Sequence, residues 1–399
     1  MILRRSILSN KIRRMEQKPK IISLPQSIEF ITEIVGNDLH AKRILSLAGA
    51  AVGVIHAGCL GVHAIGRGLA AVEGKTDKHT IKQVDRLLSN KGLDFRAVER
   101  HWVRWVVGAR KSLIVNMDWT DFDADGQEMI VLSLQTDHGR STPLVWLTVR
   151  DTELKGNQFR FETEVLMRLA EAIDPDVAVI IVADRGFGDV DRYQSIWELN
   201  FHYVIRFRGN INVVAADGEK RTAHAWTGAN GQLKVLHDAH VTAALYPVPT
   251  VVCVRDPEMK AGWFLASNVP NATGRDIVRI YGKRFTTEET FRDTKDLRFG
   301  MGLSWQKVGD PQRRDRLFLL AALAHGLLTL LGAAGEAAGL DRLLKSNTSK
   351  TRQLSLFRQG LRWYDLIPNM PEPRLRLLIE HFAAEISKHA VFQEILGKI

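Results

Sequence analysis

One short polar segment, YGKRFTTEETFRDTKD, combines residue types that could act on a phosphate. Tyr281, Arg284, Glu288 and Lys295 follow one another at steps of 3, 4 and 7 residues. Such steps return to the same side of an α-helix. We therefore expect one helix whose face presents a phenol, a guanidinium, a carboxylate and an ammonium group.

Taken alone, this face has an ordinary explanation. Arg284 and Glu288 are four residues apart and could form a surface ion pair, which stabilises a helix by about 0.3–0.5 kcal/mol. A catalytic role for Glu288 requires acidic partners elsewhere in the chain. Glu289 competes for that role, but it lies about 100° around the helix from Glu288 and so away from this face.

Two aspartates in predicted strands are the candidate partners. Asp118 lies in the β-rich stretch 111–123, and Asp184 follows an apolar run within 176–189 that is typical of a buried strand. Carboxylates at the edge of adjacent strands, with a third on a helix packed across them, can hold two divalent ions. Oxygen ligands favour Mg²⁺ or Mn²⁺ over zinc. Asp118, Asp184 and Glu288 are the candidate catalytic residues and metal ligands.

These aspartates also have a purely structural interpretation. Asp118 belongs to an acidic patch that could be a solvated loop, and Asp121 in the same patch competes for the metal role. Asp184, followed by Arg185 and Gly186, could be an ordinary turn at the end of a strand. The order Asp, Asp, Glu on suitable elements, together with a basic N-terminal region, favours the functional interpretation.

The positive charge is concentrated at the N-terminus. Residues 1–110 contain 19 Lys or Arg and 9 Asp or Glu, so they carry the whole formal net charge of +10. Their pattern is helical, and Lys78, Lys82 and Arg86 lie on the outer face of the helix expected at 76–90. A basic module on a near-neutral body indicates a polyanion-binding region, although any exposed helix can carry such residues. We predict that these three side chains contact DNA.

The rest of the chain alternates strands and helices in an informative order. The expected elements are three strands within 111–151, a helix at about 160–173, a buried strand within 176–189, a short helix at about 190–199, a strand at 201–209, short strands within 210–268 and helices within 311–345. We predict an α/β fold, with an RNase H-like mixed sheet, a β-rich insertion and all-α regions at both ends.

With these residues in place, the sequence resembles the DDE transposases of bacterial insertion sequences. The resemblance is to the subgroup marked by Tyr-x2-Arg-x3-Glu-x6-Lys, which Tyr281, Arg284, Glu288 and Lys295 fit without gaps. It covers about residues 40–345. In this subgroup a β-rich insertion separates the second and third acids, as the long stretch after Asp184 suggests here.

The resemblance implies a mechanism. A transposase dimer binds the terminal inverted repeats of its element, cuts them with two Mg²⁺ or Mn²⁺ ions per active site, and joins the freed 3′-hydroxyls to target DNA. Tyr281, Arg284 and Lys295 would bind phosphates beside the cut. In several relatives a tryptophan of the insertion stacks on a flipped base. Trp226, near a turn, is the better candidate, and Trp263 is expected in the core.

The implied domains follow the element order. They are a helical DNA-binding region at 1–110, the first part of the catalytic core at 111–209, the β-rich insertion at 210–268, the second part of the core with the Glu288 helix at 269–310, and a C-terminal helical region at 311–399. Two other functions stay open: an inactive, transposase-derived repressor that only binds the ends, and an RNase H-like nuclease that cuts without joining.

The two cysteines and the longest apolar run indicate where in the cell the protein is located. Cys59 and Cys253 are far apart in sequence and make neither a disulfide framework nor a zinc site, which suits a reducing cytoplasm. The longest apolar run, 317–335, contains His325 and has charged flanks, so we expect a buried helix there. We therefore expect a cytoplasmic protein that binds double-stranded DNA and does not enter a membrane.

Overall fold

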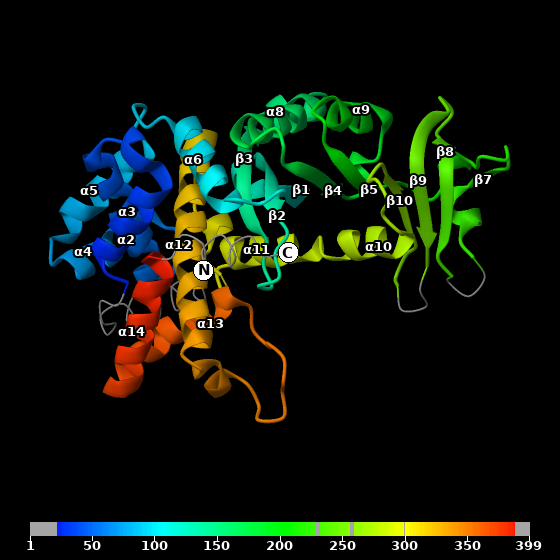
Figure 1. The fold of residues 1–399 in the computed structure, drawn as a ribbon. Coiled ribbons are helices and arrows are strands. Elements are labelled where there is room, and N and C mark those ends of the chain that lie inside the picture. The colour runs from blue at the N-terminus through cyan, green and yellow to red at the C-terminus, as the bar shows by residue number, and fades with distance from the viewer. Residues whose placement is uncertain (1–21, 229–231, 256–258, 299, 388–399) are drawn as a thin grey trace.

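The computed structural model describes residues 22–228, 232–255, 259–298 and 300–387 (Figure 1). The basic cluster within residues 1–20 lies outside these ranges. The described chain forms one ten-stranded mixed sheet covered by helices, with helical regions before and after it (Figure 1). The predicted fold class is confirmed.

Five strands form the part of the sheet that carries the predicted aspartates. They are β1 (Ser112–Phe122), β2 (Gln127–Leu134), β3 (Thr142–Arg150), β4 (Ala178–Ala183) and β5 (His202–Arg206). The first three form an antiparallel meander, whereas β4 pairs in parallel with both β1 and β5. Strand β4 is apolar at every position because it lies inside the sheet with helices on both faces.

Helices cover this part of the sheet on both sides. Helices α8 (Gln158–Ala172) and α9 (Val190–Glu198) lie over one face, and α10 (Gly274–Gly282) and α11 (Phe285–Lys295) run along the other (Figure 1). The short helix α7 (Asp151–Leu154) follows β3. Helix α10 begins with a capping box between Thr273 and Asp276, which fixes its first turn. The helix that carries Glu288 is thus held against the sheet face.

The β-rich insertion continues the same sheet. Its strands are β6 (Asn212–Val214), β7 (Lys220–Thr222), β8 (Lys234–Val241), β9 (Tyr246–Val254) and β10 (Trp263–Ser267). Strand β10 returns antiparallel to β5 and joins the two halves of the sheet. Val252 and Leu265 of the insertion pack in one apolar cluster with Val182, Val204 and Tyr281. The insertion therefore shares a core with the strands that precede it.

The terminal regions are helical, as predicted. Before the sheet come α2 (Leu24–Val35), α3 (Ala41–Ala57), α4 (Val62–Glu73), α5 (Asp77–Leu88) and α6 (Phe95–Val107), and after it come α12 (Pro311–Ala337), α13 (Leu356–Leu366) and α14 (Glu372–Ser387). Helix α12 stands between the N-terminal helices and the sheet (Figure 1). A side chain at Gly332 or Gly360 would collide with the backbone of the facing helix, so glycine permits the close packing of α12 and α13.

Helix α12 also explains the long apolar run. It is long and apolar enough to cross a membrane by length and composition, as is the bent pair α3 and α4, and its most apolar window is 100% buried inside the protein. The predicted buried helix is confirmed.

A buried carboxylate links α12 to the sheet and predicts a pH dependence of stability. Asp315 Oδ1 accepts hydrogen bonds from the backbone N–H and the hydroxyl of Thr148 on β3, at 2.9 and 2.6 Å. Burial raises the pKa of Asp315 to about 7, whereas an unfolded Asp has a pKa of about 3.9. Between these values the folded protein holds a proton that the unfolded chain releases. The free energy of unfolding should therefore fall as the pH rises from about 4 to about 7.

Replacing Asp315 by Asn tests this expectation. The amide oxygen can still accept both bonds from Thr148, but the side chain no longer ionises. We expect the variant to be more stable than the wild type at pH 8, by roughly 2–4 kcal/mol, and the difference to vanish near pH 4. Urea unfolding at a series of pH values measures it, and a difference that does not change with pH would contradict it.

Candidate active site

The parallel pairing of β1 and β4 brings the first two acids to one place. Met117 on β1 is the partner of Ala183 on β4, and Asp118 and Asp184 are the next residues along each strand. Asp184 Oδ1 accepts a hydrogen bond from the Gly186 N–H at 2.7 Å, which shapes the turn that leaves β4. Both carboxylates therefore lie where the parallel pairing of β1 and β4 ends, on the carboxyl side, where α/β proteins place their sites.

Helix α11 carries the third acid, Glu288, and Arg284 links this acid to Asp118. The Arg284 guanidinium donates from Nη1 to Asp118 Oδ2 at 2.9 Å and from Nη2 to Glu288 Oε1 at 3.0 Å. Arg284 is nearly buried, with 7% of its surface exposed. One guanidinium thus bridges the first and third carboxylates.

The electrostatics of Asp118 indicate a crowded negative site. The pKa of Asp118 is raised to about 6, chiefly by burial; the Arg284 guanidinium opposes the rise, and the negative charges of Asp184 and Glu288 contribute to it. Like charges around a buried carboxylate favour the binding of a cation. In this conformation Arg284 is that cation.

The donor types fit a divalent metal, because all three acids offer hard oxygen ligands. Within the described ranges, however, no group of three or more His, Cys, Asp or Glu side chains is close enough to hold a metal ion. Asp118 and Glu288 are instead paired with Arg284. Joint metal binding by the three acids therefore requires the Arg284 guanidinium to move.

We call Tyr281, Arg284, Glu288 and Lys295 the signature residues. The continuous helix predicted to carry them is broken in the structure. Helix α10 ends at Gly282 and α11 starts at Phe285, although Arg284 keeps a right-handed helical backbone. The Thr286 hydroxyl donates to the Lys283 carbonyl at 2.8 Å, and the Thr287 N–H bonds to the Arg284 carbonyl three residues back. The side-chain bond competes with the regular i to i−4 ladder here. The signature residues therefore sit on two short helices.

The outer signature residues have different surroundings. Tyr281 is buried and packs edge-on against Trp263, with ring centroids 4.9 Å apart. Lys295 Nζ donates to Thr120 Oγ1 at 2.8 Å and to Asp121 Oδ1 at 2.6 Å. Asp121, the alternative to Asp118, is therefore bound to Lys295, and Asp118 is the one that shares a partner with Glu288.

A buried polar network that the sequence did not predict joins strand β1 to helix α11, the elements that carry the first and third acids. Asn116, two residues before Asp118, donates its amide to the Thr287 hydroxyl at 2.9 Å, and Gln135 donates to Asn116 Oδ1 at 2.7 Å. Thr287 directly precedes Glu288. The one available signal was a polar Asn inside an apolar strand, on the same strand face as Asp118.

Two other sets of predicted residues lie apart from this edge. Lys78, Lys82 and Arg86 are exposed on α5, across α12 from the acids (Figure 1). Trp226 is 7% exposed, and its indole N–H donates to the Val213 carbonyl at 3.1 Å. Trp226 is thus a core residue in this conformation, and its stacking on a flipped base stays a prediction that requires this segment to open.

Comparison with known proteins agrees with this site. Residues 160–326 match the family model of the transposase DDE domain. The match covers less than half of the chain. It includes Asp184, Glu288 and the signature residues but not Asp118 or the N-terminal helices. No curated protein matches the chain. The match supports a transposase, which is a DNA-processing enzyme.

Proposed function

We propose that this protein is a transposase that binds the terminal inverted repeats of an insertion sequence and catalyses metal-dependent DNA cleavage and strand transfer. The observation that carries the proposal is that the Arg284 guanidinium bonds to both Asp118 and Glu288, while Asp118 and Asp184 directly follow paired positions of β1 and β4. The family match to residues 160–326 supports the same class.

In this proposal Asp118, Asp184 and Glu288 hold two Mg²⁺ or Mn²⁺ ions. When bound, such ions would activate a water or a 3′-hydroxyl and stabilise the leaving oxygen of the phosphodiester. Arg284 neutralises the carboxylates of the free protein, and it would turn to a DNA phosphate when metal ions replace it, because a guanidinium forms bidentate pairs with both carboxylate and phosphate. Lys295 would bind a second phosphate beside it.

The remaining parts of the proposal concern partners and location. Two copies of the chain would pair the two ends of the element, as a homodimer in a complex with double-stranded DNA, in the cytoplasm. The same fold and acids would serve a nuclease that cuts without joining, and an inactive chain would act as an end-binding repressor. A cleavage and joining assay distinguishes these two alternative functions from a transposase.

The test is a cleavage and joining assay on linear DNA that carries the element's own terminal repeats, with a second DNA as target. We expect cutting at the repeat end and joining with Mg²⁺ or Mn²⁺, and neither with a chelator. Glu288→Gln should remove both activities. Glu289→Gln is the matched control, because it removes a neighbouring exposed charge that does not contact Asp118 or Arg284.

The outcomes separate the three functions. Metal-dependent cutting and joining that Glu288→Gln abolishes and Glu289→Gln preserves establishes the transposase. Specific end binding without any cutting identifies the repressor, and cutting anywhere without joining identifies the nuclease. Either of the last two results would overturn the proposal.

A further inference from the structure

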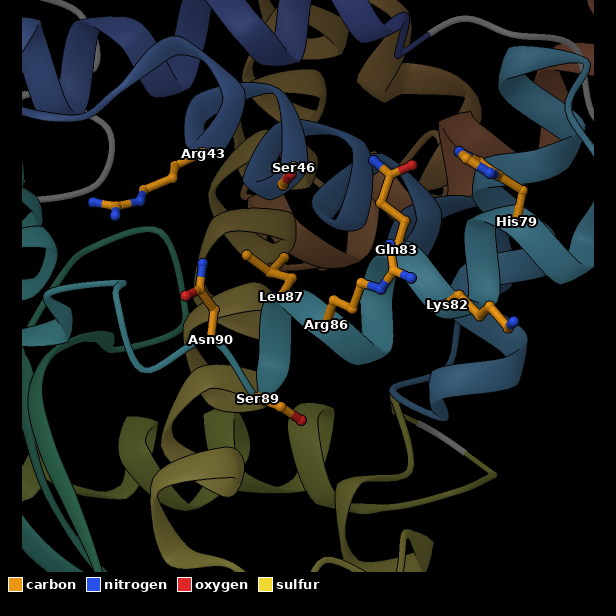
Figure 2. A pocket seen from close by; sticks show the side chains of 9 residues that line it. All are labelled: Arg43, Ser46, His79, Lys82, Gln83, Arg86, Leu87, Ser89 and Asn90. Atoms are coloured by element: carbon orange, nitrogen blue, oxygen red, sulfur yellow. The ribbon is translucent and has the colours of Figure 1, made fainter.

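A hollow of about 790 Å³ lies on the N-terminal helices, outside the residues that the family model matches. We call it the α3–α5 groove. One wall carries Arg43 and Ser46 of α3, and the other carries Lys82, Gln83 and Arg86 of α5 (Figure 2). Ser89 and Asn90 close the end where α5 stops (Figure 2).

The groove is basic because its cations are not neutralised. Among the residues that the structure describes, no ion pair holds Arg43, Lys82 or Arg86. The acids of the same helix are engaged elsewhere: Asp85 pairs with Arg313 of α12 at 2.6 Å, and Asp77 pairs with Arg67 at 3.6 Å. Three free positive charges therefore face one open hollow.

The polar lining points to a nucleic-acid ligand. Lysine, arginine and serine side chains are the usual partners of DNA phosphates. Gln83 lines the groove beside Lys82 and about one turn before Arg86, and Gln and Asn amides are suited to the edge of adenine in the major groove. We propose, on the basis of the proposed transposase function, that the α3–α5 groove binds the sugar–phosphate backbone of duplex DNA at the element's end, with Gln83 and Asn90 placed to contact base edges.

The groove is also fixed relative to the catalytic half of the molecule. Arg313 of α12 donates to Asp85 Oδ1 and to Ser89 Oγ, both at 2.6 Å, and Arg316 donates to the Leu88 carbonyl at 3.1 Å. Helix α12 packs on β3 of the sheet that carries the acids. DNA held in the groove would therefore keep a set position relative to the active-site edge.

Only two of the three basic residues that the sequence predicted to contact DNA line the groove. Lys82 and Arg86 line it, whereas Lys78 does not, although it is exposed on the same helix. Arg100→Ala removes an exposed cation of α6 that does not line the groove, and it is the matched control for Lys82→Ala combined with Arg86→Ala. All three side chains are exposed, so the variants should fold, which circular dichroism and thermal melting check.

The experiment measures equilibrium binding of the full chain to a labelled duplex with the terminal repeat and to a scrambled duplex, over a series of salt concentrations. The double variant should bind the repeat roughly tenfold more weakly. The negative slope of log K against log[salt] should become less steep, by about 0.9 for each phosphate contact removed. Arg100→Ala should match the wild type. Gln83→Ala should reduce the ratio of the affinity for the repeat to the affinity for the scrambled duplex, and it should leave the salt slope unchanged.

Two failures are distinguishable. Wild-type protein that does not prefer the terminal repeat contradicts the proposed function itself. If the wild-type protein prefers the repeat, the groove alone is overturned when the double variant keeps both its affinity and its salt slope, or when Arg100→Ala is equally impaired.

Discussion

Replacing Asp184 by Asn is expected to lower strand cleavage by about 10³-fold while end binding stays intact. A metal ligand at a phosphoryl-transfer site supports several kcal/mol of transition-state stabilisation, and each 1.36 kcal/mol is tenfold in rate. The amide oxygen of Asn can still accept the Gly186 N–H, so the turn after β4 should persist. The proposed DNA-binding groove lies on other elements, so binding should not change.

A cleavage assay and a binding assay on the same duplex check this prediction. Asp191→Asn is the control, since Asp191 is an exposed acid of α9, seven residues after Asp184, and is not one of the predicted metal ligands. Cleavage that survives in Asp184→Asn would rule out a metal site that includes Asp184. Loss of binding together with cleavage would show that the substitution damages more than the active site.

Much of the fold could be predicted from the sequence because its signals are local. The alternation of apolar residues and turns located β1 to β3, and the continuous apolar run located β4. Asp118 within β1 and Asp184 after β4 could be proposed as partners because adjacent parallel strands bring such positions to one edge. The Asp118 and Asp184 positions in the β1–β4 register have this arrangement.

What could not be predicted depends on contacts between distant segments. Nothing local indicates that β10 returns to pair with β5, so the continuation of the sheet into the insertion was not foreseen. The i,i+4 spacing suggested an Arg284–Glu288 pair, but the second contact, with Asp118, comes from the packing of α11 on β1. Trp226 looked exposed because it lies near turn residues, yet its ring is buried beneath Arg221, 5.0 Å from the ring centroid.

The anchor of the catalytic helix is another such long-range contact. Asp293 of α11 is completely buried, and it accepts from Arg140 Nε at 2.5 Å and from the Arg358 guanidinium. Arg140 lies in the loop between β2 and β3, and Arg358 lies on α13. One carboxylate therefore joins three segments that are far apart in the sequence, five residues from Glu288.

Replacing Asp293 by Ala should destabilise the protein by about 3–5 kcal/mol, because it leaves Arg140 and Arg358 without their shared counter-charge in a buried place. Urea or thermal unfolding measures the loss. Glu289→Gln is the control: this half-exposed acid of the same helix pairs with Arg292 and, at the longer distance of 3.6 Å, with Arg140, so its loss should change stability by less than about 1 kcal/mol.

A second variant separates buried charge from lost packing. Combining Asp293→Ala with Arg358→Leu removes one of the two stranded cations, so the double variant should recover part of the stability that Asp293→Ala loses. If the losses of stability in Asp293→Ala and in Arg358→Leu simply add in the double variant, the loss comes from packing, and the ion-pair explanation is wrong. Recovery would mean that the helix of Glu288 is held in place chiefly by a shared charge, since two arginines from other segments converge on it.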